Sequence, residues 1–297
     1  MTSRNKKLPL VCIIILNLNG KSFTENCLNS IQENTAYKQY RTIVVDNNST
    51  DGSREMIKSR FKWVNLIENT ENRGFSGGNN DGISWAIKRY NPDYFYLLNN
   101  DTLVMDGWLS EAIKTAEHDS KIGIVGSKQF NFDKEPTISA GWIKTTGVKY
   151  YYGDEDREVS WVSGAGFLIK KEAIMKIGLF DEMYNPAYYE ETDFERRAIM
   201  AGFKIFHSIK SVFLHAGGGT TKNEKQKDYN VIFYRNRARF FSKYNPVGLI
   251  FRFFTDIIRA GGRIIWIDLV RSYFLGIKDR NKNEIKYPYN LEKNETD

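Results

Sequence analysis

The segment Tyr94–Asp106, YFYLLNNDTLVMD, is a short aromatic and aliphatic run that stops on three polar residues, Asn99, Asn100 and Asp101. The length and composition of Tyr94–Leu98 predict a strand that is buried on both faces, as in a parallel sheet. Ligands bind at the carboxyl edge of such a sheet, and a carboxylate flanked by amides suits a hard divalent cation. The segment therefore predicts a cation site, with a polar turn before a helix as the simpler alternative.

Around this segment, apolar runs of strand length alternate with stretches of helical periodicity. The predicted strands are Leu10–Leu16, Arg41–Asp46, Trp63–Glu68 and Ile122–Gly126, and the predicted helices are Ser22–Glu33, Ser53–Phe61, Asp81–Tyr90 and Asp106–His118. Between the third strand and the third helix, Asn69–Asn80 reads NTENRGFSGGNN and is predicted to be a loop. This order predicts an α/β fold, with a mostly parallel sheet flanked by helices.

The composition favours one catalytic domain with an appendage, because 297 residues with 41% hydrophobic content can bury a large core. Cys12 and Cys27 are predicted to be buried free thiols rather than a disulfide framework. The basic amino terminus leads into a short apolar strand, so we expect neither a signal peptide nor a membrane span there. The chain offers no run of about 18 apolar residues. A cytoplasmic protein, soluble or peripherally attached to a membrane, is the expectation.

The net charge of +7 is concentrated near the carboxyl end. Residues 222–297 contain 16 Lys and Arg against 9 Asp and Glu, a difference of +7, so the rest of the chain is close to neutral. A basic segment of this kind is typical of proteins that bind nucleic acid, anionic lipid or a phosphate-rich substrate. An ordinary solvated surface is the alternative.

Polar residues follow each of the first three predicted strands. A carboxylate at a strand end can accept the imide N–H of uracil or thymine, glycines let backbone amides approach a diphosphate, and an arginine can pair with phosphate. A helix cap, a chain turn and a solvated side chain are the corresponding alternatives. Neither GxGxxG nor GxxxxGK[ST] is present, so ordinary dinucleotide and P-loop functions are disfavoured. The residues concerned are Asn17 and Asn19, then Asp46 and Asn48, then Arg73, Gly74, Gly78 and Asn79.

Taken together, VCIIILNLNG, IVVDNNSTDGS, NRGFSGGNN and LLNNDT resemble the nucleotide-sugar half of family-2 glycosyltransferases of the GT-A fold, in particular bacterial rhamnosyltransferase-type members. The resemblance implies that NND occupies the DxD position, that Asp101 binds a divalent metal, Mn²⁺ or Mg²⁺, and that Asp46 contacts the base. Asn100 joins the strand-end residues above as a donor-binding candidate. Asn99 stands where the motif has its first aspartate, so the metal site is expected to be weaker.

The acceptor side is predicted from WVSGAGFLIKKEAIMKIGLFDE, Trp161–Glu182, which resembles the family's strand, small-residue loop and helix near the acceptor. Trp161, Gly164, Ala165 and Gly166 are the acceptor-binding candidates. Small residues in such a loop can equally serve tight backbone packing.

Glu190, Glu191 and Asp193 lie in the first turn of a predicted helix, where acidic residues are common because they interact favourably with the free amides. The surrounding YYEETDFERR resembles the family's ED motif, whose second acidic residue is the general base. On this resemblance Glu191 deprotonates the acceptor hydroxyl, and the helix terminus is expected to keep it ionised. Glu190 and Asp193 remain alternative catalytic residues.

His215 ends an apolar strand before a glycine run, VFLHAGGG. The resemblance implies that a histidine at this HxGG position joins Asp101 on the metal, so the predicted metal set is Asp101, His215 and Asn99. The YRN segment, Tyr234–Asn236, is expected near the active site.

Residues 1–245 are predicted to form the GT-A domain, with a donor half of about 1–127 and an acceptor half of about 128–245. Residues 246–297 are predicted to form a helical extension whose amphipathic helices carry arginine along their polar margins. Packing on the catalytic domain, a homodimer interface and attachment to an anionic membrane are open alternatives. The resemblance favours the membrane, which places the protein on the inner face of the plasma membrane.

The predicted function is metal-dependent, inverting transfer of a sugar, with rhamnose as the candidate, from a dTDP- or UDP-linked donor to a glycan or lipid-linked glycan. No nucleic acid partner is expected. The alternatives are a sugar nucleotidyltransferase and a non-catalytic sugar- or lipid-binding protein whose site has decayed.

Overall fold

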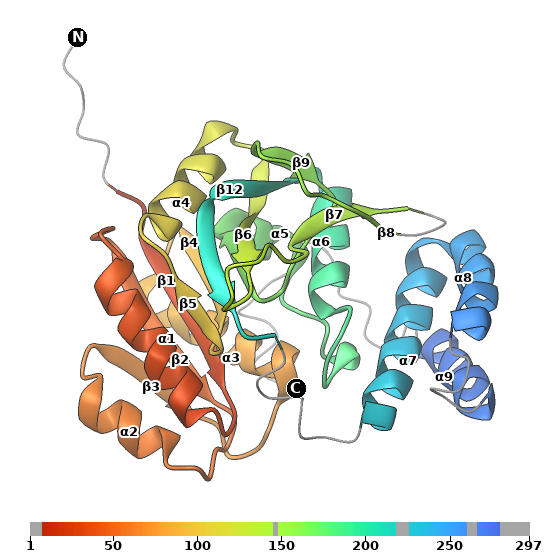
Figure 1. The fold of residues 1–297 in the computed structure, drawn as a ribbon, viewed down its shortest axis with the longest axis horizontal. Coiled ribbons are helices and arrows are strands. Elements are labelled where there is room, and N and C mark those ends of the chain that lie inside the picture. The colour runs from red at the N-terminus through yellow and green to blue at the C-terminus, as the bar shows by residue number, and fades with distance from the viewer. Residues whose placement is uncertain (1–7, 145–147, 218–225, 260–265, 280–297) are drawn as a thin grey trace.

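The computed structural model of the chain describes residues 8–144, 148–217, 226–259 and 266–279 (Figure 1). The strands of the main sheet run in the order β3-β2-β1-β4-β11-β6-β12-β5, and β9 pairs with β12. A second, small sheet has the order β10-β7-β8. The strands are β1 (Val11–Asn17), β2 (Tyr40–Asp46), β3 (Val64–Glu68), β4 (Tyr94–Asn99), β5 (Thr102–Val104), β6 (Ile122–Phe130), β7 (Ala140–Ile143), β8 (Val148–Tyr150), β9 (Arg157–Val159), β10 (Trp161–Val162), β11 (Gly166–Lys170) and β12 (Lys204–His215).

Strands β1 to β4 pair in parallel, whereas β11 runs antiparallel to β4. Gly166 at the start of β11 lies opposite Leu98 near the end of β4, so the loop before β11 reaches the carboxyl end of β4. The antiparallel pair of β12 with β5 places His215 opposite Thr102. Three segments that are distant in sequence therefore meet where β4 ends.

Helices cover both faces of the sheet, which confirms the predicted α/β class. Helices α1 (Lys21–Asn34), α2 (Ser53–Arg60) and α4 (Trp108–His118) share one hydrophobic core with the sheet. Helices α3 (Gly74–Tyr90), α5 (Lys171–Ile177) and α6 (Glu190–Met200) share the other. A short 3-10 helix, η1 (Glu182–Tyr184), precedes α6. Both cysteines are buried free thiols, as predicted.

The prediction of a loop over the whole of Asn69–Asn80 was wrong, because α3 begins at Gly74. A side chain at Gly78 would come within 2.7 Å of Leu16 Cδ2, and one at Gly82 within 2.7 Å of Ile14 Cγ2. These glycines therefore let α3 pack closely against β1. Their helix-breaking tendency is outweighed by the burial that this close packing permits.

Three helices follow the sheet domain: α7 (Gln226–Tyr244), α8 (Pro246–Arg259) and α9 (Trp266–Lys278), drawn in blue in Figure 1. Ala238 of α7 packs with Leu269 and Tyr273 of α9, while Phe240 and Phe241 of α7 pack with Tyr184. Helix α7 thus contacts both parts of the chain. The domain boundary at residue 245 remains a prediction, and residues 260–265 and 280–297 of the predicted extension lie outside the described residues.

Helix α8 turns its apolar side outward, contrary to the expectation that its arginine would lie on a polar margin. Arg252 and Asp256 are buried, whereas Phe254 is 60% and Ile258 80% exposed. Asp256 pairs with Arg237 of α7, and the guanidinium of Arg252 lies over the ring of Phe241. The charged side of α8 therefore faces the helical unit, and its apolar side faces away from it. In the described part of the chain, no helix combines the length and apolar character needed to cross a membrane.

Candidate active site

The ends of β1, β2 and β4 are joined by a network of buried polar side chains. Asn17 Nδ2 donates to Asp46 Oδ2 at 2.7 Å, and Asn100 Nδ2 donates to Asn17 Oδ1 at 3.1 Å. All three side chains belong to residues that are less than 9% exposed. Three of the predicted donor-binding residues therefore lie side by side at the carboxyl edge of the sheet.

Asp46 is ionised and held in place from several directions. Its Oδ1 accepts bonds from Ser49 N at 2.8 Å and from Arg54 Nε at 2.6 Å. Burial raises the pKa of Asp46, but the hydrogen bonds from Ser49, Arg54 and Asn17 outweigh burial and hold the pKa below its usual value. Arg54 was not among the donor-site residues predicted from the sequence. The one feature that could have indicated it is its place as a basic residue directly after IVVDNNSTDGS.

Asn19 and Asn48 stand at the outer rim of this network, in left-handed backbone conformations with φ of 49° and 71°. Asn19 Oδ1 accepts a bond from Thr50 N at 2.8 Å, and Asn48 Oδ1 accepts one from Arg54 Nη2 at 3.2 Å. Both residues are exposed, so their remaining polar atoms face solvent at the sheet edge. Their role in donor binding remains a prediction.

Polar side chains of the third predicted donor loop are engaged in contacts within the protein. Arg73 Nε lies 2.8 Å from Asp81 Oδ2, and Arg73 Nη2 lies 3.2 Å from Glu182 Oε1. Asn79 is buried in α3 and donates to Phe75 O at 3.0 Å. The structure therefore brings Gly74 and Arg73 to the start of α3 but turns Gly78 and Asn79 into its packed interior.

The three predicted metal ligands lie together at the end of β4. His215 Nε2 is 3.0 Å from Asp101 Oδ1 and 3.5 Å from Asn99 Nδ2. Within the described residues, no group of three or more His, Cys, Asp or Glu side chains could hold a metal ion by itself. One carboxylate, one imidazole and one amide fit a divalent ion only if oxygens of a ligand complete its shell.

Gln129, which sequence reasoning missed, orients the imidazole of His215. Its Nε2 lies 3.0 Å from His215 Nδ1, while its buried Oε1 has no hydrogen-bond partner in the described structure. In this orientation Nδ1 accepts from the amide N–H of Gln129. With the amide turned by 180°, Oε1 would accept from Nδ1–H, and the Nε2 lone pair of His215 would point toward Asp101. Such an outer partner is what a metal-ligating histidine requires, so the residues present fit a metal.

Glu191 lies next to the small-residue loop that precedes β11. A side chain at Gly164 would come within 3.4 Å of Glu191 Cγ, and the following residue, Ala165, accepts a bond from Asn99 N at 2.8 Å. The Gly164–Ala165 loop therefore contacts both Glu191 and the end of β4. Trp161 donates a side-chain hydrogen bond to Glu191. Gly166 instead packs against Phe213 and leaves no room for a side chain.

Two opposing influences act on the pKa of Glu191. Burial raises the pKa of Glu191 above its ordinary value, although hydrogen bonds from backbone amides and Trp161 oppose this. Burial, together with the charge of Glu191, raises the pKa values of Glu190 and Glu195 much further. The raised pKa of Glu191 gives this carboxylate the basicity that a proton acceptor needs.

Asp193 is fully buried and has no access to a substrate. Its oxygens contact Arg197 Nε at 2.7 Å, Lys243 Nζ at 3.1 Å and Tyr244 Oη at 2.8 Å. Burial raises its pKa, but the charges of Arg197 and Lys243 dominate and leave the pKa below its usual value. Asp193 therefore ties α6 to α7, and Glu191 is the member of the predicted catalytic set that lines a cavity.

The loop before α6 is strained and is held by the YRN segment. Tyr188 and Tyr189 adopt φ of 72° and 74°, a conformation that side chains larger than glycine seldom take. Asn236 Nδ2 donates to the carbonyls of Tyr184, Ala187 and Tyr188 at 2.6, 2.8 and 3.0 Å. This clamp fixes the backbone that enters the first turn of α6, and so fixes Glu191.

We expect Asn236→Ala to lower the free energy of unfolding by about 2–3 kcal/mol, since it removes a buried donor shared by the carbonyls of Tyr184, Ala187 and Tyr188. The rate of the reaction that uses Glu191 should fall as well, because the loop can relax. Denaturant unfolding and steady-state kinetics measure the two effects. Asn34→Ala, which removes one bond to Val104 O, is the matched control and should cost under about 1 kcal/mol without a kinetic effect. Equal effects of both changes would contradict the clamp.

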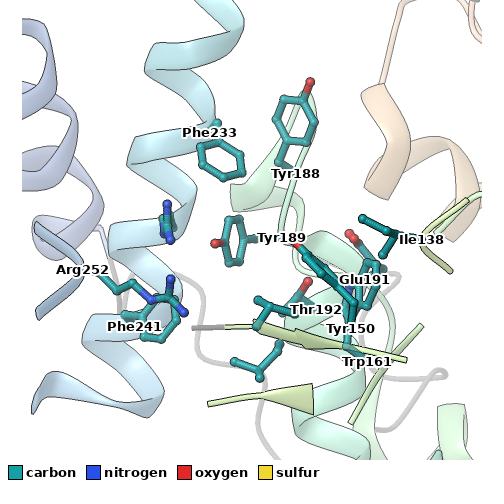
Figure 2. A pocket seen from close by; sticks show the side chains of 13 residues that line it. Ile138, Tyr150, Trp161, Tyr188, Tyr189, Glu191, Thr192, Phe233, Phe241 and Arg252 are labelled. Carbon is teal, nitrogen blue, oxygen red and sulfur yellow. The ribbon is translucent and has the colours of Figure 1, made fainter. Parts of the chain in front are cut away.

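A cavity of about 490 Å³ opens beside Glu191, between α6, the small sheet and helices α7 and α8. Figure 2 shows Glu191, Tyr150 and Trp161 on one side, Arg252 and Phe241 on the other, and Tyr189 between them. A carboxylate with a raised pKa in a largely aromatic cavity is an arrangement typical of a binding or catalytic site.

Comparison with solved structures identifies the class of fold. The chain superposes on GalNAc-T7, solved with UDP, GalNAc and Mn²⁺, with a TM-score of 0.62 at 14% identity, over 93% of this chain and 55% of that one. It superposes on the mannosyltransferase PcManGT of Pyrobaculum calidifontis, solved with GDP-Man and Mn²⁺, with a TM-score of 0.56 at 17% identity, over 93% of this chain and 74% of that one. The predicted GT-A fold is confirmed.

The family follows from the sequence comparison. Residues 12–178, more than half of the chain, match the model of glycosyl transferase family 2, and the chain belongs to this family. The hexosyltransferase Agl10 of low-salt glycan biosynthesis in Haloferax volcanii is 24% identical over 63% of this chain and 60% of its own length. N-acetylglucosaminyl-diphospho-decaprenol L-rhamnosyltransferase of Mycobacterium tuberculosis is 23% identical over 58% of this chain and 65% of its own length. The match thus spans less than two thirds of either relative.

The raised pKa of Glu191 predicts a pH dependence. Glu191 must be ionised to accept a proton, so kcat/KM should rise with pH through its pKa, and this limb should lie above the ordinary value of 4.5. A pH profile of sugar transfer, compared with the pH dependence of donor binding, isolates the effect. A kcat/KM that stays level from pH 8 down to about pH 4.5 would contradict an essential Glu191 with a raised pKa.

Proposed function

We propose that the chain transfers a sugar from a dTDP- or UDP-linked donor to a hydroxyl of a glycan or lipid-linked glycan, with inversion at the anomeric carbon. One observation carries the proposal: the Gly164–Ala165 loop joins Glu191 in its cavity to the end of β4, where Asp101 and His215 meet. An acid–base residue and a candidate diphosphate site are therefore neighbours, as a direct displacement requires.

The donor would lie along the carboxyl edge of the sheet. Asp46 is the candidate to accept the imide N–H of a pyrimidine base. Its carboxylate is fully buried and held by Asn17 and Arg54, so the donor must displace part of this network to reach it. The start of α3 at Gly74 offers backbone amides to phosphate oxygens. Arg73 supplies little charge there, because Asp81 and Glu182 already neutralise it.

Asp101 and His215, with Asn99, would hold a divalent metal, with Mn²⁺ or Mg²⁺ as the candidates. When bound, such an ion supplies positive charge that stabilises a departing diphosphate. With its amide oxygen turned to Nδ1, Gln129 would hold His215 in the metal-binding tautomer, and Asn100 anchors the loop to Asn17. Because Asp101 is the single carboxylate in this set, the diphosphate of the donor would have to supply the rest of the negative charge around the metal.

Glu191 performs the acid–base step. An acceptor hydroxyl in the cavity is a poor nucleophile until its proton moves to Glu191 as its oxygen bonds to the anomeric carbon. The bond from that carbon to the diphosphate breaks on the opposite face, which inverts the configuration. Trp161 steadies the carboxylate through its hydrogen bond, and Glu195 fixes the adjacent strand by accepting from Val162 N at 2.9 Å.

Incubation with a panel of dTDP- and UDP-sugars, dTDP-rhamnose included, tests this function. Slow hydrolysis to the nucleoside diphosphate and free sugar without an acceptor, dependent on Mn²⁺ or Mg²⁺, is the expected result. Formation of a nucleotide sugar and pyrophosphate from a nucleoside triphosphate and a sugar phosphate would instead establish a nucleotidyltransferase. Ligand binding without any turnover would favour a non-catalytic binding protein.

The outward side of α8 is proposed to bind an anionic membrane surface. Val247, Ile250, Phe254 and Ile258 are exposed along one side of α8. Phe274 of α9 is exposed too, as are the basic residues Arg271 and Lys278 of the same helix. Apolar side chains with neighbouring cations suit the interface of a negatively charged bilayer. This contact would place the protein on the inner face of the plasma membrane.

We expect the protein to sediment with vesicles that contain phosphatidylglycerol and far less with pure phosphatidylcholine vesicles. The double change Phe254→Glu and Ile258→Glu should abolish this binding, because it places two charges on the apolar side. Met200→Glu changes an exposed apolar residue of α6 and is the matched control. Absence of vesicle binding, together with a dimer in light scattering that the double change dissociates, would assign this face to a second copy instead.

A further inference from the structure

A second cavity adjoins the one that contains Glu191. Its volume is about 300 Å³, and Ile143 and Phe241 line both cavities. Helix α6 also reaches both, because Glu191 lines the first cavity and Arg196 lines the second. These two positions are separated by roughly 7.5 Å along the axis of α6 at the usual rise of an α-helix. The two cavities are therefore placed to receive neighbouring parts of one elongated ligand.

Two cations from different elements line the second cavity. Lys144 follows β7, Arg196 belongs to α6, and both side chains are exposed. Neither forms an ion pair with another residue in the described part of the chain, and none of the described residues that line this cavity is acidic. Charges of one sign around a cavity draw an oppositely charged ligand into it, most strongly at low salt. The second cavity therefore favours an anion.

A hydroxyl group adds a donor to these two cations. Ser160 lines the cavity, and its Oγ accepts the backbone N–H of Ile143 at 2.9 Å. The hydroxyl hydrogen of Ser160 is donated to no residue that the structure describes, so it remains available to a ligand. An ammonium group, a guanidinium fork and a hydroxyl group are together the donors that carboxylate or phosphate oxygens accept from.

Helix α7 supplies an aromatic wall to the same cavity. The ring centre of Phe240 lies 5.4 Å from that of Phe241 and 5.1 Å from that of Tyr244, and all three residues line the cavity. The hydroxyl of Tyr244 donates to Asp193 Oδ1 at 2.8 Å, which holds its ring in place. The apolar C–H faces of a sugar ring pack on aromatic rings, whereas a small inorganic anion gains little from them. The second cavity thus suits a sugar that carries negative charge.

We propose that the second cavity is a subsite for an acidic sugar of the acceptor glycan, with the oxyanion of this sugar at Lys144 and Arg196 and the neighbouring sugar at Glu191. The inference rests on the proposed function and narrows the acceptor to a negatively charged oligosaccharide. The oxyanion can be the carboxylate of a uronic acid or a phosphate group on a sugar, because both accept hydrogen bonds from ammonium and guanidinium groups.

Ligand-observed NMR titration with glucuronate, glucose 6-phosphate and methyl glucoside tests the subsite without knowledge of the whole acceptor. At low salt, with a chelator present, at least one of the two anions should bind the wild-type protein about tenfold more tightly than the uncharged glucoside. Lys144→Gln and Arg196→Gln should each reduce this preference about threefold, and the double variant should lose it. Arg89→Gln changes an exposed arginine of α3 outside both cavities and is the matched control. Thermal melts establish that each variant is folded.

Tighter binding of glucuronate than of glucose 6-phosphate would assign the subsite to a uronic acid, and the reverse order to a phosphorylated sugar. Equal binding of all three compounds, or a preference for the anions that survives in the double variant, would overturn the subsite. Hydrolysis of nucleotide sugars by the same wild-type preparation separates the two claims. A protein that hydrolyses them but shows no preference for the anions retains the proposed function and loses only the acidic subsite.

Discussion

Replacing Glu191 with Gln is expected to lower kcat for sugar transfer by about 10²- to 10⁴-fold, the range typical for loss of a general base. The amide keeps the size of the side chain and its contact with Gly164, but it cannot take a proton. The Kd of the nucleotide sugar should not change, because Glu191 lies on the acceptor side of the Gly164–Ala165 loop. Transfer kinetics and donor titration measure the two quantities separately.

Glu195→Gln is the matched control for this change. Glu195 is buried, and burial raises its pKa well above the ordinary value. The amide oxygen can still accept the bond from Val162 N, so transfer should continue near the wild-type rate. A Glu191→Gln protein with full activity, alongside a Glu190→Gln protein without it, would move the base to the neighbouring residue.

Replacing Asp101 with Asn is expected to lower kcat/KM by at least about 10³-fold. The change removes the one carboxylate of the Asp101, His215 and Asn99 set, and stabilisation of leaving-group charge by a metal contributes several kcal/mol. Affinity for Mn²⁺ should fall more than the roughly 10- to 100-fold that loss of an outer-shell partner costs. Electron paramagnetic resonance titration of Mn²⁺ in the presence of nucleoside diphosphate measures it.

Asn99→Asp provides a test of opposite sign at the same site. It adds a second carboxylate near His215 Nε2 and should tighten Mn²⁺ binding about tenfold, because one more negative charge faces the ion. The same substitution should make Mn²⁺ binding less dependent on the nucleotide. If neither Asp101→Asn nor Asn99→Asp altered Mn²⁺ affinity, the end of β4 would not be a metal site.

Much of the donor half could be predicted from the sequence because its signals are local. Buried strands such as Tyr94–Leu98 are continuous apolar runs, and in a parallel sheet the residues that follow each strand must meet at one edge. This geometry brought Asn17, Asp46 and Asn100 together as expected. It could not reveal that Arg54 would return from α2 to hold Asp46.

The errors arose where packing overrides local preference. A run rich in glycine and asparagine normally favours a loop, yet Gly78 and Gly82 are needed for α3 to approach β1. Likewise, an amphipathic helix normally turns its charges outward, but Arg252 of α8 faces an internal cavity. Both outcomes depend on neighbours far away in the sequence.

The acceptor site was the least predictable part for the same reason. Residue type and position alone do not separate Glu190, Glu191 and Asp193, and only the family resemblance favours Glu191. The contacts of Asp193 with Lys243 and Tyr244 on α7 show that Asp193 serves packing. The cavity itself is assembled from α6, the small sheet and two helices of the C-terminal unit. No local pattern encodes such an assembly.

The most direct measurement is a thermal-shift titration of the wild-type protein with dTDP- and UDP-sugars, with and without Mn²⁺. We predict that at least one of these sugars raises Tm by about 5 °C at saturating concentration, and that a chelator or Asp101→Asn removes the rise. A rise of equal size with and without the metal would contradict the metal site at the end of β4. No response to any pyrimidine nucleotide sugar would contradict the proposed function.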